Sequence, residues 1–307
     1  MNQVSSKVSS KVSIALHTMY LFELIKQAQL MIHPRVNGTA QAQWQYPIVG
    51  KFPDSYYRYN AQSLLELSYR VSVHNREVND GISDPLSLNP PGFDIVIPID
   101  CTYMFMKVNV AWFFYSSSMN IAVVVATATY NNILSIVDLS YLQEVPNITN
   151  YVEGMKVHGG FWGLYEKIQP NLQTLLGKYI NVDTQIILTG LSLGGAISTI
   201  AVTDLYQLKL NNGVTIKDII HYSFASPRLF NIVGAEAYKT LKICSEQIHN
   251  GSDIIPVVPL PIMPTSIITS ETQDFMHVGD LTYFDRNLGS YYDNHVTAYL
   301  EEYNVTA

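Results

Sequence analysis

The chain of 307 residues is long enough to bury a large core, and its 48% hydrophobic and 14% charged residues exclude a disordered protein. A formal net charge of −7, with no run of lysine or arginine, argues against a nucleic-acid partner, whose phosphates would need neutralising. Two cysteines, Cys101 and Cys244, are too few for a metal site of their own or for a disulfide framework, so we expect free buried thiols.

The first candidate element is an apolar stretch over residues 12–32. His17, Glu23 and Lys26 interrupt it, and no small-residue cleavage site follows, so a membrane span or signal peptide is disfavoured. Apolar residues recur there at helical spacing, at Ile14, Leu21, Ile25, Ala28 and Ile32. We expect an amphipathic helix packed on the domain. The compartment is left open, and the lack of a clear signal peptide or membrane span slightly favours an intracellular protein over a secreted one.

A second helix is predicted over 60–79, where apolar side chains gather on one side and Asn79-Asp80-Gly81 forms a stop. A loop rich in Pro, Ser and Asn leads to three β-rich runs, at 95–99, 104–115 and 121–129. The run IAVVVATA within the last is almost wholly apolar without alternation. That pattern indicates a central strand covered on both faces.

Strands and helices alternate in the rest of the chain. Helices are predicted over 161–179 and 196–210, and strands over 186–189, 219–224, 244–249 and 281–284. This order implies an α/β fold with a mostly parallel sheet and helices on both faces. With no repeat or low-complexity linker, one structural domain is expected, in which residues 1–90 form an N-terminal helical segment packed on a core of 91–307.

The stretch IILTGLSLGGA, residues 186–196, carries the clearest chemical signal. A β-favouring run enters Gly190-Leu191-Ser192-Leu193-Gly194, and a helical sequence follows. A serine at a sharp strand-to-helix turn is exposed and rigid, and the flanking glycines let strand and helix approach without Cβ clashes. Ser192 is therefore the candidate nucleophile, with the N–H of Leu193 directed at an oxyanion.

A serine nucleophile needs a base and an acid downstream in this chain order. Among the carboxylates after Ser192, Asp253 follows a predicted strand through the turn Asn250-Gly251-Ser252, which places it just past a strand end. The candidate bases are four histidines, His221, His249, His277 and His295. The first two lie inside predicted strands, and position alone favours His295 over His277 only by about two to one.

Six motifs occur in order between residues 90 and 300. They are VHGGF (157–161), TGLSLGGA (189–196), FASPRLFN (224–231), NGSDIIPVVP (250–259), FMHVG (275–279) and NHVTAYL (294–300). Together they resemble the class 3 lipases, the α/β-hydrolases that include the fungal triacylglycerol lipases. The resemblance implies an α/β-hydrolase fold with a short lid, Ser192 as nucleophile, Asp253 as acid and His295 as base, with no metal or cofactor.

The chain departs from the family at the first oxyanion strand. Counting back from Asp138-Leu139 aligns Ala126-Thr127-Ala128-Thr129 with the family's Phe-Arg-Gly-Ser/Thr. The resemblance implies Thr129 as the second oxyanion donor beside Leu193. The family's Arg and Gly are missing, so Thr127 cannot make the ion pairs of an arginine and Ala128 restricts the backbone. A weaker enzyme is one consequence to test.

Two apolar segments lie near this predicted site. NNILSIV, between Tyr130 and Val137, matches the lid position, with a plain surface helix as the alternative; its apolar residues are Ile133, Leu134, Ile136 and Val137. The run 254–268 carries four prolines and almost no charge. We expect its prolines to prevent strand pairing and leave an apolar loop at the site mouth or under the N-terminal helix.

The leading hypothesis is a lipase, a serine ester hydrolase that cleaves glycerides or related lipids and contacts a membrane or lipid-droplet surface. The alternatives are a soluble esterase or phospholipase on the same fold, or a catalytically weak or inactive lipid-binding homologue, suggested by the altered 126–129 stretch. The oligomeric state is left open.

Overall fold

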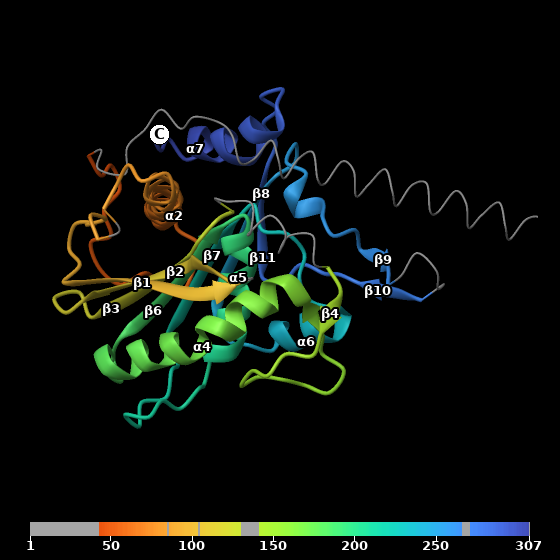
Figure 1. Cartoon of the computed structure of the whole chain (residues 1–307), viewed down its shortest axis with the longest axis horizontal. Coiled ribbons are helices and arrows are strands. Elements are labelled where there is room, and N and C mark those ends of the chain that lie inside the picture. The colour runs from red at the N-terminus through yellow and green to blue at the C-terminus, as the bar shows by residue number, and fades with distance from the viewer. Residues whose placement is uncertain (1–42, 85, 104, 130–140, 266–270, 307) are drawn as a thin grey trace, which may run out of the picture.

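The computed structural model describes residues 43–84, 86–103, 105–129, 141–265 and 271–306 (Figure 1). The helix expected over 12–32 and the lid candidates Ile133, Leu134, Ile136 and Val137 lie outside these residues. Within the described residues no helix combines the length and the apolar character needed to cross a membrane.

A seven-stranded sheet forms the centre of the molecule, in the order β1-β2-β3-β6-β7-β8-β11. The strands are β1 (Ile95–Tyr103), β2 (Met106–Ser116), β3 (Ile121–Ala126), β6 (Gln185–Leu191), β7 (Ile219–Phe224), β8 (Cys244–Asn250) and β11 (Asp280–Phe284). Short turns join β1, β2 and β3, which pair antiparallel, and every pair from β3 onward is parallel. The predicted mostly parallel sheet is confirmed.

Helices cover both faces of the sheet (Figure 1). The helices α4 (Gly159–Tyr179), α5 (Leu193–Leu205) and α6 (Ile232–Lys239) lie on one face, and α2 (Arg58–Asn79) and α7 (Ala298–Glu302) lie on the other. Successive residues of β3 enter different cores: Val124 packs in the core with α4 and α5, and Val123 and Val125 pack in the core with α2. Burial on both faces explains why the run 121–126 is apolar without alternation.

Helix α5 ends earlier than predicted. The sequence indicated a helix to Leu210, but α5 ends at Leu205, and Tyr206 takes an extended conformation. The side chain of Asn150 donates hydrogen bonds to the carbonyls of Thr203 and Tyr206, at 2.8 and 2.7 Å. A long-range partner therefore satisfies the last carbonyls of the helix, and helical periodicity does not reveal such a cap.

A buried ion pair in helix α2 binds the preceding segment 43–46. Arg70 Nη2 lies 2.8 Å from Glu66 Oε1, and both side chains are almost fully buried. Glu66 accepts the backbone N–H groups of Gln45 and Tyr46, and Arg70 donates to the carbonyl of Gln43. The pair is fully hydrogen-bonded, which offsets the cost of taking both charges out of water. It fixes the segment 43–46 against the helix.

The proline-rich run does contain a paired strand, so that expectation was wrong. Residues 255–257 form the short 3-10 helix η1 (Ile255–Val257), and β9 (Ile262–Pro264) pairs antiparallel with β10 (Thr272–Asp274). Proline is tolerated here because this two-stranded ribbon has only edge strands and Pro264 is the last residue of β9. The ribbon projects from the end of the molecule near β8 (Figure 1).

Both cysteines are free, as the sequence predicted. Cys101 lies in β1 and Cys244 begins β8, and both are half-buried. Burial raises the pKa of each thiol to about 11. Neither thiol is therefore activated as a nucleophile near neutral pH.

Candidate active site

Ser192 lies at the sharp turn between β6 and α5. Its backbone has φ 59° and ψ −125°, a strained conformation for a residue with a side chain. A Cβ atom on Gly194 would overlap the carbonyl oxygen of Ala126 at the end of β3, and one on Gly190 would overlap the backbone of Gly194. The two glycines thus permit the close approach of strand and helix that the sequence predicted, and this approach holds the serine at the carboxyl end of the sheet.

Asp253 and His295 come together from different segments. Asp253 follows β8, and its N–H donates to the carbonyl of Asn250 at 3.0 Å. His295 lies in a short π-helical turn, Asp293–Thr297, that leads into α7. The Asn250 side chain donates to the carbonyl of Asn294 at 2.9 Å and so ties the two segments together. As a result, Nδ1 of His295 lies 2.8 Å from Oδ2 of Asp253.

The Asp253 carboxylate is fully hydrogen-bonded. Besides His295, it accepts the backbone N–H of Ile255 at 2.9 Å and the hydroxyl of Tyr299 at 3.0 Å. Burial and the nearby carboxylate raise the pKa of Tyr299, so its hydroxyl stays protonated and donates. A carboxylate only accepts, so Nδ1 of His295 carries the proton and Nε2 is left as an acceptor. Sequence reasoning missed Tyr299, although it lies within the motif NHVTAYL.

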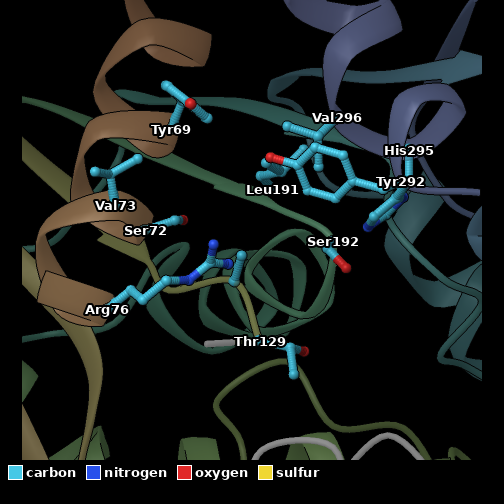
Figure 2. Close-up of a pocket in the computed structure, with 11 residues that line it drawn as sticks. Tyr69, Ser72, Val73, Arg76, Thr129, Leu191, Ser192, Tyr292, His295 and Val296 are labelled. Carbon is cyan, nitrogen blue, oxygen red and sulfur yellow. The ribbon is translucent and has the colours of Figure 1, made fainter. Parts of the chain in front are cut away.

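Ser192 and His295 line one pocket, and in Figure 2 a ring nitrogen of His295 is directed toward Ser192. The Nδ1 side of the ring faces Asp253, so the other side is available to the serine. The full lining is Tyr69, Ser72, Val73, Arg76, Ala128, Thr129, Leu191, Ser192, Tyr292, His295 and Val296. The structure thus places Ser192 and His295 in one pocket and joins His295 to Asp253 by a hydrogen bond.

The two oxyanion candidates are the residue that follows Ser192 and a residue that lines the same pocket. Leu193 is the first residue of α5, so its N–H lies at the positive end of the helix, where the N–H groups lack intrahelical acceptors. Thr129 lines the pocket. Thr127, at the family's arginine position, is buried, and its hydroxyl donates to the carbonyl of Asn109 at 3.1 Å. This hydrogen bond fixes the residue that follows β3, in place of the ion pair that an arginine would form there.

Helix α2 forms one wall of the pocket, and this was not predicted. Tyr69, Ser72, Val73 and Arg76 all line it, and Figure 2 shows them on the helix face turned toward Ser192. Their spacing of three, four and seven residues from Tyr69 places them on one side of a helix. That spacing was visible in the sequence, but it could not reveal what the face packs against.

The other histidines stay outside the pocket. His221 in β7 is fully buried and forms hydrogen bonds with Ser198 at 3.1 Å and Ser245 at 2.9 Å. The rings of His249 and His277 lie 4.5 Å apart, and Nε2 of His277 donates to the carbonyl of Pro256. Among the other carboxylates, Asp204 is buried in α5 and accepts hydrogen bonds from Thr149 and Tyr165, away from Ser192.

These three histidines should make folding sensitive to acid. Burial is the main cause that lowers the pKa of His221 and His249 to about 3 and that of His277 to about 4. Neighbouring positive charges contribute at His249 and His277, and the hydrogen bond to Pro256 acts in the opposite direction at His277. These values lie below the unfolded value of about 6.5, so between about pH 6.5 and 4 the unfolded chain binds more protons. The contribution of these neutral histidines to the free energy of unfolding is therefore present above about pH 6.5 and is lost as the pH falls below that value. We expect the free energy of unfolding to fall by about 4 kcal/mol between pH 7.5 and 5.5.

Urea unfolding at the two pH values measures this loss. His249→Gln removes one of the three titrating groups and should reduce the fall by about a third. An unchanged pH dependence in that variant would show that His249 has the same pKa in the folded protein as in the unfolded chain.

Three features define an α/β-hydrolase fold. They are the order of the strands in the sheet, the strand-turn-helix that carries Ser192, and the hydrogen bond between His295 and Asp253. Residues 123–263 match the family model for lipase (class 3). This match confirms the resemblance to the class 3 lipases over these residues, which include Ser192 and Asp253.

Curated relatives include two fungal lipases. The lipase of Rhizopus niveus is 30% identical over 117 residues, which are 37% of this chain and 29% of the relative. The lipase of Rhizomucor miehei is 31% identical over 126 residues, which are 40% of this chain and 33% of the relative. The matched part is thus about a third of the length of these relatives.

Solved structures share the fold at low identity. Rhizomucor miehei triacylglyceride lipase has a TM-score of 0.55 and 22% identity, with 73% of this chain and 78% of that chain covered. A triacylglycerol lipase whose catalytic centre is formed by a serine protease triad has a TM-score of 0.54 and 22% identity over the same shares of the two chains. The predicted α/β-hydrolase fold is confirmed.

Proposed function

We propose that this protein is a serine carboxylic-ester hydrolase that cleaves acyl esters of glycerides or related lipids. The observation that carries the proposal is the hydrogen bond between His295 Nδ1 and Asp253 Oδ2, with Ser192 in the same pocket as the imidazole. A serine hydroxyl is a weak nucleophile at neutral pH, and an oriented imidazole activates it. The lipase relatives support an ester as the substrate.

The reaction follows from the positions of these groups. Nε2 of His295 takes the Ser192 proton as Oγ attacks the ester carbonyl, and the imidazolium forms beside the Asp253 carboxylate. The N–H groups of Leu193 and Thr129 hold the oxyanion. His295 then protonates the leaving alcohol, and water activated by the same histidine releases the acid from Ser192.

The exposed apolar residues that follow Asp253 in the chain support a lipid substrate. The segment after Asp253 exposes Val257, Leu260 and Ile262, with Ile262 66% accessible. A group of exposed apolar side chains favours contact with a lipid or protein surface. A fungal lipase of similar fold, with a TM-score of 0.55, was used to explain interfacial activation. We propose that this edge rests on the lipid while the ester enters the pocket.

A fluorophosphonate probe tests the proposal directly. Such probes form a covalent bond only with an activated serine, so the folded protein should be labelled on the peptide that contains Ser192. The label should be absent after acid unfolding and in Ser192→Ala. A folded, unlabelled wild-type protein would favour the non-catalytic lipid-binding alternative.

A further inference from the structure

Two prolines reduce the number of hydrogen-bond donors in the turn that carries Asp253. We call residues 253–259 the acid turn. Two of its N–H groups donate to carbonyls inside the turn, at 2.9 and 3.1 Å, whereas Pro256 and Pro259 have no N–H to donate. The carbonyls of its last four residues, 256–259, therefore take their donors from other parts of the chain.

Two residues from other segments supply these donors. Nε2 of His277 donates to the carbonyl of Pro256 at 2.6 Å. Arg228 donates to the next three carbonyls, 257–259. Its backbone N–H bonds the middle one at 2.9 Å, and its guanidinium bonds the outer two, at 3.0 Å for Pro259. Four consecutive carbonyls of the acid turn are thus held by Arg228 and His277.

The two donor residues are fixed relative to each other. Arg228 lies in the segment after β7, and His277 lies between β10 and β11. These segments meet at an isolated bridge between Phe230 and Met276, where the N–H of Met276 donates to the carbonyl of Phe230 at 2.7 Å. The ring of His277 also lies 4.5 Å from that of His249, in β8. The donors are therefore attached to the sheet and to each other.

A neutral imidazole supplies the bond to Pro256 without adding a charge to a buried site. Nε2 must carry the proton that it donates to a carbonyl, so Nδ1 of His277 is unprotonated. Burial and the positive charge of Arg228 lower the pKa of His277 to about 4, against the opposing effect of the hydrogen bond to Pro256. The donor is therefore present throughout the neutral pH range.

We propose that Arg228 and His277 are positioning residues, which hold the acid turn so that the carboxylate of Asp253 meets Nδ1 of His295. Within the described part of the chain, neither Arg228 nor His277 lines the pocket of Ser192. Their effect on the reaction therefore passes through Asp253.

The position of the acid turn and that of the carboxylate are coupled. Oδ1 of Asp253 accepts the N–H of Ile255 at 2.9 Å, and Oδ2 accepts from Nδ1 of His295 at 2.8 Å. Ile255 directly precedes Pro256, whose carbonyl His277 holds. If that carbonyl is released, the N–H that orients Oδ1 is free to move, and Oδ2 moves with it.

Replacing His277 by leucine tests this role, whose catalytic meaning rests on the proposed function. The substitution removes the donor to Pro256 and leaves an apolar side chain in the buried site. We expect kcat for a soluble p-nitrophenyl ester to fall roughly tenfold to hundredfold, because a shift of about 1 Å in a catalytic group has an effect of this size. The loss should be smaller than in Asp253→Asn, because the carboxylate remains and Tyr299 still donates to it. KM should change little.

His277→Gln tests whether the donor itself is responsible. The glutamine amide places an N–H close to the position of Nε2, so this variant should recover most of the lost kcat. His221→Leu is the matched control. It also removes a buried imidazole, but His221 bonds Ser198 and Ser245 and not the acid turn. We expect this control to lose stability and to keep its kcat.

A proton NMR signal separates positioning from a general loss of stability. The proton on Nδ1 of His295 lies in a charge-assisted hydrogen bond to Asp253, which moves its resonance far downfield. This resonance should be present in wild type, in His277→Gln and in His221→Leu, and it should be lost in His277→Leu. A variant that is only less stable keeps the resonance while it is folded.

Two results in folded protein would overturn the inference. One is His277→Leu with the kcat and the downfield resonance of wild type, and the other is His277→Gln that is as impaired as His277→Leu. If wild type showed no more turnover than Ser192→Ala, the proposed function would fail. The downfield resonance would still show whether His277 positions Asp253, because it does not depend on turnover.

If His277→Leu does not fold, wild type and a second variant provide the test. The nitrogen NMR spectrum of wild type shows which ring nitrogen of His277 carries the proton. A proton on Nδ1 would exclude the bond to Pro256 and overturn the inference, whereas a proton on Nε2 supports it. Arg228→Met removes the guanidinium bonds to the acid turn and should lower kcat and weaken the downfield resonance. Wild-type values of both in folded Arg228→Met would contradict the role of Arg228.

Discussion

Replacing Ser192 by alanine should lower kcat for ester hydrolysis by about six orders of magnitude, because the nucleophile is lost and His295 and Asp253 have no proton to move. The substitution deletes one oxygen and keeps the Cβ atom, so the strained backbone at φ 59° is unchanged. The free energy of unfolding should stay within about 1 kcal/mol of wild type. The measurement is turnover of a p-nitrophenyl ester together with urea unfolding.

Ser117→Ala is the matched control for this variant. Ser117 is an exposed serine in the turn before β3, at the end of that strand remote from Ser192. It should retain wild-type turnover. Equal turnover in folded Ser192→Ala and wild type would end the assignment of Ser192 as nucleophile.

The second large effect is expected for Asp253→Asn, at about four orders of magnitude in kcat. The carboxylate keeps the proton on Nδ1 of His295, because it can only accept from the ring. An asparagine amide can donate to Nδ1 instead, which moves the ring proton to Nε2 and removes the base that Ser192 requires. Asp253 does not line the substrate pocket, so KM should change little.

Asp285→Asn provides the comparison for this substitution. Asp285 is exposed, follows β11 and accepts the hydroxyl of Ser252 at 2.9 Å, outside the pocket. Its kcat should match wild type. A loss in Asp253→Asn that is smaller than tenfold, in protein shown to be folded, would mean that another group orients His295.

The elements around Ser192 could be read from the sequence because their signals are local. An apolar run without alternation, glycines at the turn and a following helical pattern are properties of neighbouring residues, and β6 and α5 formed where they were expected. Their ends were less predictable. Asn150 caps α5 from a distant loop, and the paired β9 depends on a partner strand supplied by residues 272–274.

The sequence reduced the number of candidate partners of Ser192 but did not identify the base. Position alone left His277 and His295 as rival bases, and the family resemblance chose between them. In the structure Nε2 of His277 is engaged with the carbonyl of Pro256, and His295 faces Asp253. The choice between His277 and His295 depends on which segments come into contact after folding. The positions of the two histidines along the chain do not show this.

By itself the sequence determined the class of fold and the strand-turn-helix that carries Ser192. It also determined the set of residues from which the partners of Ser192 come. Each of these depends on the order of residues that are close together in the chain. Only the tertiary structure decided that Tyr299 supports Asp253 and that α2 places Tyr69 and Arg76 against the pocket. Helical spacing shows which side chains share a face. Which surface that face meets depends on packing between elements more than a hundred residues apart in the chain.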